Sequence, residues 1–392
     1  MRLKRVEISK YRNFENVVIN FDKNDNFPDV FSLASKNGGG KSTLLQFIFI
    51  LLSCFLKEER KQYIINLLDE DEYVPYSDLV MFTFEYNKKE YLLNIDFDLS
   101  ENYNFKYITN MSMEFLIKVS NNIYLTVPEA QPLHFLSKDD DISKLKELLP
   151  NFSTYNFPTE KDILQSFTNA KEEDFEDMRI NGKYGTNYID FKKTLKDFIE
   201  GKEIGENKDA TKIVFKLKGN EELLLEDLSH GEMRKLGIYI WLKNRVKKDS
   251  IILMDEVDIA LHPLWQYELV DDLVKWSKGS QFLLATHSPQ ILSSTYYKNL
   301  IILDQEDGKV SLKQLKEAPL DRDINVILSN IMGSGYFPKY LKNLHIEYRN
   351  LFENGQVDSK KAKELKLEIL EYESENSSFF QGIAFDKEVQ DI

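Results

Sequence analysis

The stretch FSLASKNGGGKST, residues Phe31 to Thr43, decides the fold. It opens with apolar and small residues, passes through three glycines and ends in a lysine and two hydroxyl residues. Its end, Gly40-Lys41-Ser42, matches the end of the phosphate-loop pattern G-x-x-x-x-G-K-[ST], whereas Ser35 stands at the first glycine position. An apolar run, Leu44 to Leu56, follows directly. We therefore expect a buried strand, a phosphate-binding loop and a core helix in this order, and a flexible glycine turn is the alternative.

Each residue type in this loop suits a bound triphosphate. Gly38, Gly39 and Gly40 let backbone N–H groups approach the phosphates closely. The Lys41 side chain would reach the β- and γ-phosphates, and the Ser42 hydroxyl would bind Mg²⁺. The N-terminus of the following helix adds partial positive charge.

A second segment, SIILMDEVD from Ser250 to Asp258, predicts a buried strand that ends in carboxylates. Asp255 at the strand tip suits the metal, directly or through a water molecule. Glu256 suits a general base that orients the attacking water. A solvent-exposed acidic strand end is the alternative.

The segment QFLLATHSP, Gln281 to Pro289, places His287 at the tip of the next buried strand. A histidine there can donate a hydrogen bond to a γ-phosphate, and a loop or capping histidine is the alternative. His262, in ALHPLW, stands at a predicted helix start, where we expect a structural cap.

A third segment, LSHGEMRKLG, runs from Leu228 to Gly237 and precedes a predicted helix. Ser229, Gly231 and the helix N-terminus together form an anion site. Glu232, three residues after Ser229, also predicts a capping box. One geometry serves both roles.

The composition indicates a cytosolic globular protein. Of the 392 residues, 42% are apolar, and the formal charge of −14 argues against broad coating of nucleic acid. The single cysteine, Cys54, excludes an intrachain disulfide and fits a reducing compartment. As a helix, the apolar run would span about 20 Å, short of the roughly 30 Å bilayer core. The basic segment Lys243 to Lys248 is predicted to be a solvated helix face, with a nucleic-acid groove as the alternative.

Short buried strands alternate with helices along most of the chain, which predicts a mostly parallel α/β sheet with an antiparallel edge. We expect a head over residues 1–320, a helical insertion over about 132–205 and a C-terminal helical extension over 321–392. The acidic run KEEDFED in the insertion is expected to be a solvated face. The expected early strands are Leu3–Ile8, Val17–Phe21, Leu79–Tyr86, Tyr91–Phe97 and Phe115–Val119, and a hairpin is expected at Leu300–Leu312.

The order of these segments resembles that of ABC-type ATPases, specifically the RecF/SMC-like branch. SKNGGGKST resembles its Walker A motif, IILMDE its Walker B motif, LSHGE its signature motif and ATHSP its switch histidine. DEVDIALHP resembles a stretch specific to this branch, and YRNF (Tyr11 to Phe14) an N-terminal element near the nucleotide. The resemblance implies an ABC-ATPase head, and it is also the basis for preferring ATP over GTP.

The resemblance further implies a composite site in which two protomers clamp ATP and Mg²⁺ between them. Glu256 and His287 would be catalytic, and Ser42 and Asp255 would hold the metal. Nucleotide contacts would come from Arg12, Asn37, Gly38, Gly39, Gly40, Lys41, Ser42, Thr43, Ser229, Gly231, Glu232 and Asp258.

The C-terminal tail resembles that of standalone bacterial anti-phage ATPases of the Septu PtuA type, which work with an HNH nuclease. The first hypothesis is therefore a cytoplasmic, homo-oligomeric ATP-dependent regulator of such a nuclease in phage defence. The second is a RecF-like ATPase that binds DNA directly in repair. A transporter nucleotide-binding subunit is least supported, because of the LHP segment and the lack of a membrane segment in the sequence.

Overall fold

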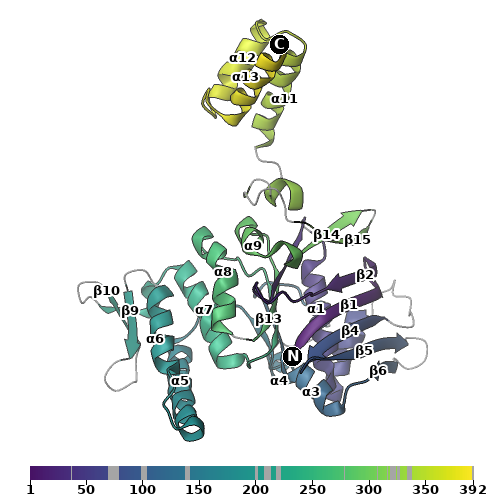
Figure 1. The fold of residues 1–392 in the computed structure, drawn as a ribbon, viewed down its shortest axis with the longest axis vertical. Coiled ribbons are helices and arrows are strands. Elements are labelled where there is room, and N and C mark those ends of the chain that lie inside the picture. The colour runs from purple at the N-terminus through teal and green to yellow at the C-terminus, as the bar shows by residue number, and fades with distance from the viewer. Residues whose placement is uncertain are drawn as a thin grey trace. The chain divides into compact units, whose positions relative to one another are not determined.

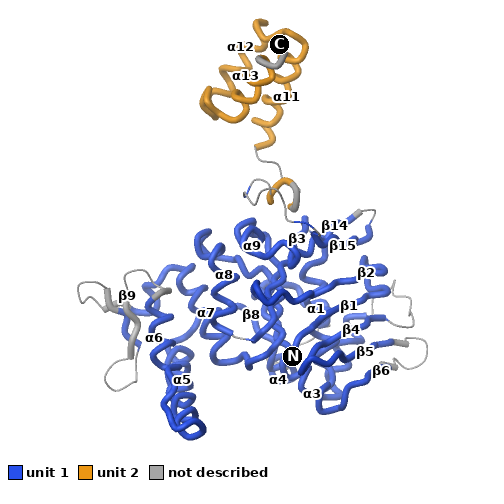
Figure 2. Tube along the Cα trace, viewed as in Figure 1, with its two compact units in different colours: residues 1–324 blue, residues 325–392 orange. Residues whose placement is uncertain are grey.

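The computed structural model divides the chain into two compact units, residues 1–324 and 325–392 (Figure 2). The residues that it describes are 1–36, 38–68, 79–98, 104–136, 142–198, 202–206, 213–217, 222–277, 279–306, 308–315, 317, 324, 327–332 and 338–390.

Among these residues, unit 1 has a 12-stranded sheet in the order β6-β5-β4-β1-β2-β15-β14-β3-β13-β12-β7-β8 (Figure 1). The strands β14, β3, β13, β12, β7 and β8 pair in parallel, whereas β2, β1, β4, β5 and β6 form an antiparallel edge. The predicted hairpin is present as the antiparallel pair β14 and β15. The strands are β1 Arg2–Tyr11, β2 Phe14–Asn20, β3 Val30–Ser35, β4 Val80–Tyr86, β5 Lys89–Asp98, β6 Asn104–Thr109, β7 Ile123–Val127, β8 Phe152–Thr154, β12 Ile251–Asp255, β13 Gln281–Ala285, β14 Leu300–Glu306 and β15 Lys309–Gln314.

Helices cover both faces of the parallel strands, because alternate residues of each strand point to opposite faces. In β12, Ile251 and Leu253 join the apolar core around α1, whereas Ile252 and Met254 join the core around α7 and α8. Figure 1 accordingly shows α7 and α8 on the other side of β13 from α1. The helices of unit 1 are α1 Lys41–Ser53, α2 Lys61–Leu68, α3 Met113–Asn121, α4 Ile142–Leu148, α5 Glu160–Asn181, α6 Asn187–Phe198, α7 His230–Arg245, α8 Pro263–Trp276 and α9 Pro289–Ser294.

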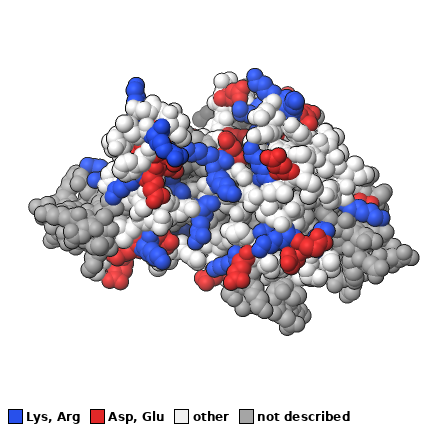
Figure 3. All heavy atoms as spheres, turned by 90° about the horizontal axis from the view of Figure 1, so that it is seen from below, with Lys and Arg blue, Asp and Glu red and all other residues white. Residues whose placement is uncertain are grey.

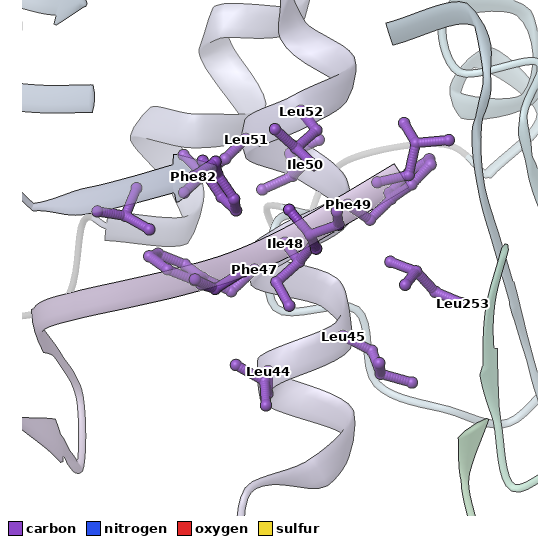
Figure 4. Close-up of a cluster of buried hydrophobic side chains, with 14 of the residues drawn as sticks. Leu44, Leu45, Phe47, Ile48, Phe49, Ile50, Leu51, Leu52, Phe82 and Leu253 are labelled. Carbon is purple, nitrogen blue, oxygen red and sulfur yellow. The ribbon is translucent and has the colours of Figure 1, made fainter. Parts of the chain in front are cut away.

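Helix α1 is buried on nearly all sides, as its apolar sequence predicts. Its side chains contact both parts of the sheet: Phe82 comes from β4 in the antiparallel edge and Leu253 from β12 in the parallel part (Figure 4). This packing fixes the phosphate loop, which lies directly before α1, relative to the strands.

The span 132–205 is not purely helical. Between α4 and α5 it contains β8, which pairs with β7 and extends the main sheet. Beyond α6, a second sheet contains β9 Lys202–Glu206, β10 Ile213–Leu217 and β11 Glu222–Leu223. In the acidic run, Asp174 is bonded by the backbone N–H groups of Asn187 and Tyr188, so it caps the start of α6.

The predicted strand Phe115–Val119 is wrong, since these residues belong to helix α3. The Ser112 side chain caps that helix by accepting a hydrogen bond from Phe115 N–H. Phe115, Leu116 and Val119 are buried and Ile117 is exposed, which is the spacing of one helix face, whereas the apolar run FLI followed by Val119 also fits a short strand. The apolar residues alone did not distinguish the two structures.

In the described part of unit 2, which comprises residues 325–392, the chain forms a three-helix bundle and a π-helical turn at Ile327–Ile331. Inside the bundle, His345 stacks on Phe379 with ring centroids 3.9 Å apart and contacts the Glu373 carboxylate at 3.0 Å. The helices are α11 Lys339–Glu353, α12 Lys360–Leu370 and α13 Ser378–Gln390.

Candidate nucleotide-binding site

Three parallel neighbours, β3, β13 and β12, carry the predicted site. Because they are parallel and in register, with Asp255 beside Ala285 and Ala285 beside Leu33, their carboxyl ends lie at one edge of the sheet. The phosphate loop follows β3, Glu256 follows β12, and His287 follows β13. The fold therefore brings together residues from three distant parts of the sequence.

The phosphate loop needs glycine at two positions for different reasons. Gly40 has a φ of 86° and caps α1, and a Cβ atom there would lie 2.8 Å from the Phe14 ring. A Cβ atom at Gly39 would lie 2.5 Å from the Ser35 Cβ. Both distances are too short for a larger residue, so the loop is tightly built. Asn37, a predicted nucleotide contact, lies outside the described residues.

The Lys41 ammonium is buried at the centre of the site. It donates to Ser35 Oγ at 3.0 Å and contacts His287 Nε2 at 2.9 Å. Burial lowers the pKa of Lys41, and the nearby carboxylates of Asp255, Asp258 and Glu256 oppose this shift. Ser35, which replaces the usual glycine, thus supplies a hydrogen-bond acceptor for the lysine.

The His287 ring faces the Lys41 ammonium. Burial lowers the pKa of His287, and the Lys41 charge lowers it further. Since an ammonium group can only donate, Nε2 is the acceptor and the neutral ring carries its proton on Nδ1. The backbone N–H of His287 donates to Asp258 Oδ1 at 3.3 Å.

Asp255 is fully buried, and neither carboxylate oxygen makes a hydrogen bond of normal geometry within the described part of the chain. Burial raises the pKa of Asp255 to about 6, while the adjacent Ser42 hydroxyl partly opposes this shift. A buried, unsatisfied carboxylate beside a serine hydroxyl is an oxygen-donor set that suits Mg²⁺. The residues present therefore fit the predicted metal.

Glu256 and Asp258 lie on the segment that leaves β12. Glu256 has a φ of 45°, which is unusual for a residue other than glycine and is characteristic of constrained sites. Asp258 Oδ1 accepts from the Thr286 hydroxyl at 2.5 Å as well as from His287 N–H. Asp258 thus ties the segment after β12 to the histidine segment, a role that the sequence did not indicate.

The YRNF element packs against the phosphate loop. Tyr11 stacks on Phe47 of α1 with ring centroids 4.1 Å apart, and the Phe14 ring lies against Gly40. Arg12 occupies the turn between β1 and β2 with a φ of 49°, and its guanidinium lies 5.5 Å from the Tyr11 ring centre.

The signature segment forms the predicted capping box. Ser229 Oγ accepts from Glu232 N–H at 3.3 Å, and the Glu232 carboxylate accepts from Ser229 N–H at 2.8 Å. A Cβ atom at Gly231 would lie 2.9 Å from the Trp265 ring. The segment begins α7, on the sheet face opposite α1.

His262 caps α8 by accepting from Leu264 N–H at 3.3 Å, so its predicted structural role is confirmed.

A further side chain near the site was missed from the sequence. Gln46 of α1 is buried and accepts from His134 N–H at 2.8 Å while donating to the Pro132 carbonyl at 2.9 Å. It holds the segment that follows β7, the neighbour of β12. Strand β7 was not predicted from the sequence. The position of the segment that follows it could therefore not be predicted either.

A family described as "AAA domain, putative AbiEii toxin, Type IV TA system" matches residues 36–293, which include the segments of the phosphate loop, the two carboxylates, the signature and His287. The chain belongs to this family. Its fold is similar to that of SMC head domains.

Two curated relatives cover most of the chain. "Retron Vc95 probable ATPase" of Vibrio cholerae serotype O1 biovar El Tor is 26% identical over 72% of this chain and 54% of its own length. "Septu protein PtuA" of Bacillus mycoides (strain KBAB4) is 24% identical over 93% of this chain and 49% of its own length. The chain thus spans about half the length of these relatives.

Solved structures confirm the predicted fold class. The SMC head domain from Thermotoga maritima has a TM-score of 0.50 at 16% identity. The match covers 81% of this chain and 100% of the SMC head chain. An SmcHead bound to the C-winged helix domain of ScpA has a TM-score of 0.51 at 17% identity, with 81% and 99% of the two chains covered. At these identities, the likeness concerns the fold.

Proposed function

We propose that this chain is a cytoplasmic ATPase whose unit 1 dimerises around ATP and that it controls a partner nuclease in anti-phage defence. The observation that carries the ATPase part is the convergence of Lys41, Asp255 and His287 at one sheet edge. A buried lysine, an unsatisfied carboxylate and a neutral histidine have a common explanation if a triphosphate and Mg²⁺ bind there.

In the proposed reaction, Lys41 exchanges its contacts with Ser35 and His287 for phosphate oxygens and offsets their charge. Mg²⁺, held by Ser42 and Asp255, would supply electrostatic stabilisation of the phosphate oxygens. Glu256 orients a water molecule and accepts its proton as that water attacks the terminal phosphorus, and ADP leaves. His287, neutral and with its proton on Nδ1 in the nucleotide-free chain, would change tautomer or rotate its ring to donate to the terminal phosphate.

Dimerisation is proposed because the signature segment and the phosphate loop start helices on opposite faces of the sheet. The Ser229 cap and the N-terminus of α7 form an anion site that would meet the phosphates of a nucleotide bound to another copy. ATP would then hold two copies together, and hydrolysis would release them.

A role in defence rests on the names of the relatives, a retron ATPase and a Septu protein. The HNH nuclease partner follows from the resemblance of the C-terminal tail. Within the described residues, no helix is both long enough and apolar enough to span a bilayer.

Direct DNA binding, as in a RecF-like repair ATPase, is the alternative. On the face drawn in Figure 3, basic and acidic side chains are intermixed. Among the described residues on that face, a continuous basic surface, which sequence-independent DNA binding favours, is therefore not present.

The substitution Glu256→Gln tests the proposal. It should reduce ATP hydrolysis at least about a hundredfold, because the water loses its base, and dimers should accumulate with ATP in multi-angle light scattering. Glu173→Gln, an exposed glutamate of α5, serves as the matched control. Hydrolysis at the wild-type rate in Glu256→Gln would show that Glu256 is not the base.

A further inference from the structure

A cavity lies away from the phosphate loop, between α7, β8 and the residues that lead into α5. The cavity has a volume of about 280 Å³. Polar side chains of Ser153, Tyr155 and Arg234 line it together with the apolar Phe157 and Trp241. This size suits a small organic molecule.

The cavity contains hydrogen-bond donors that lack acceptors. Arg234 is only 6% exposed, and its Nε and Nη2 atoms have no hydrogen-bond partner among the described residues. The hydroxyl groups of Tyr155 and Ser153 are also buried without a hydrogen bond of normal geometry there, although Tyr155 interacts with Arg234. The Arg234 guanidinium stacks on the Tyr155 ring at 3.2 Å, which fixes its plane.

The charge around the cavity is predominantly positive. Lys146, Arg234 and Arg245 line it, whereas Asp162 is the acidic residue among the lining residues. The Asp162 carboxylate already accepts from Thr159 N–H and from the Thr159 hydroxyl, in the capping box of α5. It therefore caps a helix, and among the described residues it accepts no hydrogen bond from Arg234 Nε or Nη2.

We propose that this cavity binds a small organic anion, with a phosphate or carboxylate group on Arg234 and an apolar or aromatic body against Phe157 and Trp241. Leaving the Nε and Nη2 groups of a buried guanidinium without acceptors is costly, and an oxyanion satisfies both at once. The two hydroxyl groups of Tyr155 and Ser153 offer further donors to the same anion. The nearby Asp258 carboxylate partly offsets the Arg234 charge, but among the described residues it accepts no hydrogen bond from Nε or Nη2.

The position of the cavity links the anion to nucleotide turnover, and this part rests on the proposed ATPase function. Arg234 lies on α7, in the helix that Ser229 caps, and Met254, which precedes Asp255 on β12, also lines the cavity. A bound anion would therefore fix the signature helix relative to the strand that carries the metal ligand. We expect occupancy to change the rate of ATP hydrolysis.

Calorimetry on the full chain carrying Lys41→Ala tests anion binding without interference from the phosphate loop. The probes are phenyl phosphate, benzoate and inorganic phosphate. We expect saturable binding of phenyl phosphate or benzoate, and the better of the two identifies the head group. Arg234→Gln should weaken this binding roughly tenfold to a hundredfold, whereas Lys243→Gln, an exposed change on the same helix, should leave it unchanged.

Tyr155→Phe removes only a hydroxyl group and should weaken binding several-fold. This variant therefore tests the proposal even if Arg234→Gln fails to fold. Absence of saturable binding of all three probes at millimolar concentration would overturn the proposal, as would equal binding by Arg234→Gln. If inorganic phosphate bound more tightly than both organic probes, the proposal that the ligand has an apolar or aromatic part would be refuted. If a bound probe does not change the rate of ATP hydrolysis by the unsubstituted chain, the link between anion binding and hydrolysis is refuted. If the chain binds the probe but does not hydrolyse ATP, only the proposed function is refuted.

Discussion

The buried Asp255 carboxylate should destabilise the protein when metal and nucleotide are absent. Burial raises its pKa from 3.8 to about 6, so the folded protein binds the proton more tightly than the unfolded chain does. Between these two values, the stability therefore falls as the pH rises, and above pH 6 the loss is constant. Asp255→Asn, which is neutral throughout, should be the more stable protein at neutral and alkaline pH.

The size of the effect follows from the shift. About two pKa units correspond to about 3 kcal/mol, which is the upper estimate for the gain of Asp255→Asn at pH 8. At pH 5 the unfolded carboxyl is ionised but the folded one is still mostly protonated, so the gain should be about half as large. Most carboxylates that form ion pairs behave in the opposite way, because their folded pKa is lowered.

Thermal or denaturant unfolding with a chelator, at pH 5 and pH 8, measures this difference. Asp271→Asn, an exposed carboxylate of α8, is the matched control and should change stability little at either pH. Adding Mg²⁺ and ATP should stabilise the unsubstituted protein much more than Asp255→Asn, since only the carboxylate can bind the metal as an anion. A variant that is no more stable than the unsubstituted chain at pH 8 would refute the reasoning.

Further substitutions test the phosphate loop and the signature. Lys41→Ala should abolish ATP binding, and unchanged affinity in calorimetry would contradict the assignment of the loop. Gly40→Ala should destabilise the fold by at least about 1–2 kcal/mol, because a Cβ atom is disfavoured at positive φ and would contact Phe14, and denaturant unfolding measures this loss. Ser229→Arg should retain ATP binding but block nucleotide-dependent dimers in light scattering, and normal dimers would argue against a composite site.

The sequence predicted those parts of the site in which chemistry and local structure share one short segment. Lys41 follows a glycine run before an apolar helix, and Asp255 ends an apolar strand, so each residue could be placed on its element. Because parallel strands end at the same edge of a sheet, the segments around His287 could be expected nearby as well. The predicted α/β sheet with an antiparallel edge is confirmed for the same reason, since its strands have clear apolar patterns.

What could not be predicted depends on contacts between distant segments. Strand β7 is a five-residue run, all of it buried, whose place beside β12 is set by pairing and not by any local signal. The stacking of Arg234 on Tyr155 joins a signature-helix residue to the residue after β8, and nothing in either segment indicates it. The hydrogen bond that the Thr286 hydroxyl donates to Asp258 is another contact of this kind.

Ser35 illustrates how a departure from a motif can be understood only in three dimensions. A glycine there would leave the buried Lys41 ammonium with His287 as its recorded hydrogen-bond partner. The serine hydroxyl supplies a second acceptor and itself donates to the Lys36 carbonyl at 2.7 Å. Since burial without an acceptor is costly for an ammonium group, the serine stabilises the loop before a nucleotide binds. An incoming phosphate must then compete with Ser35 and His287 for the lysine, so the contacts that order the loop also reduce its affinity for the nucleotide.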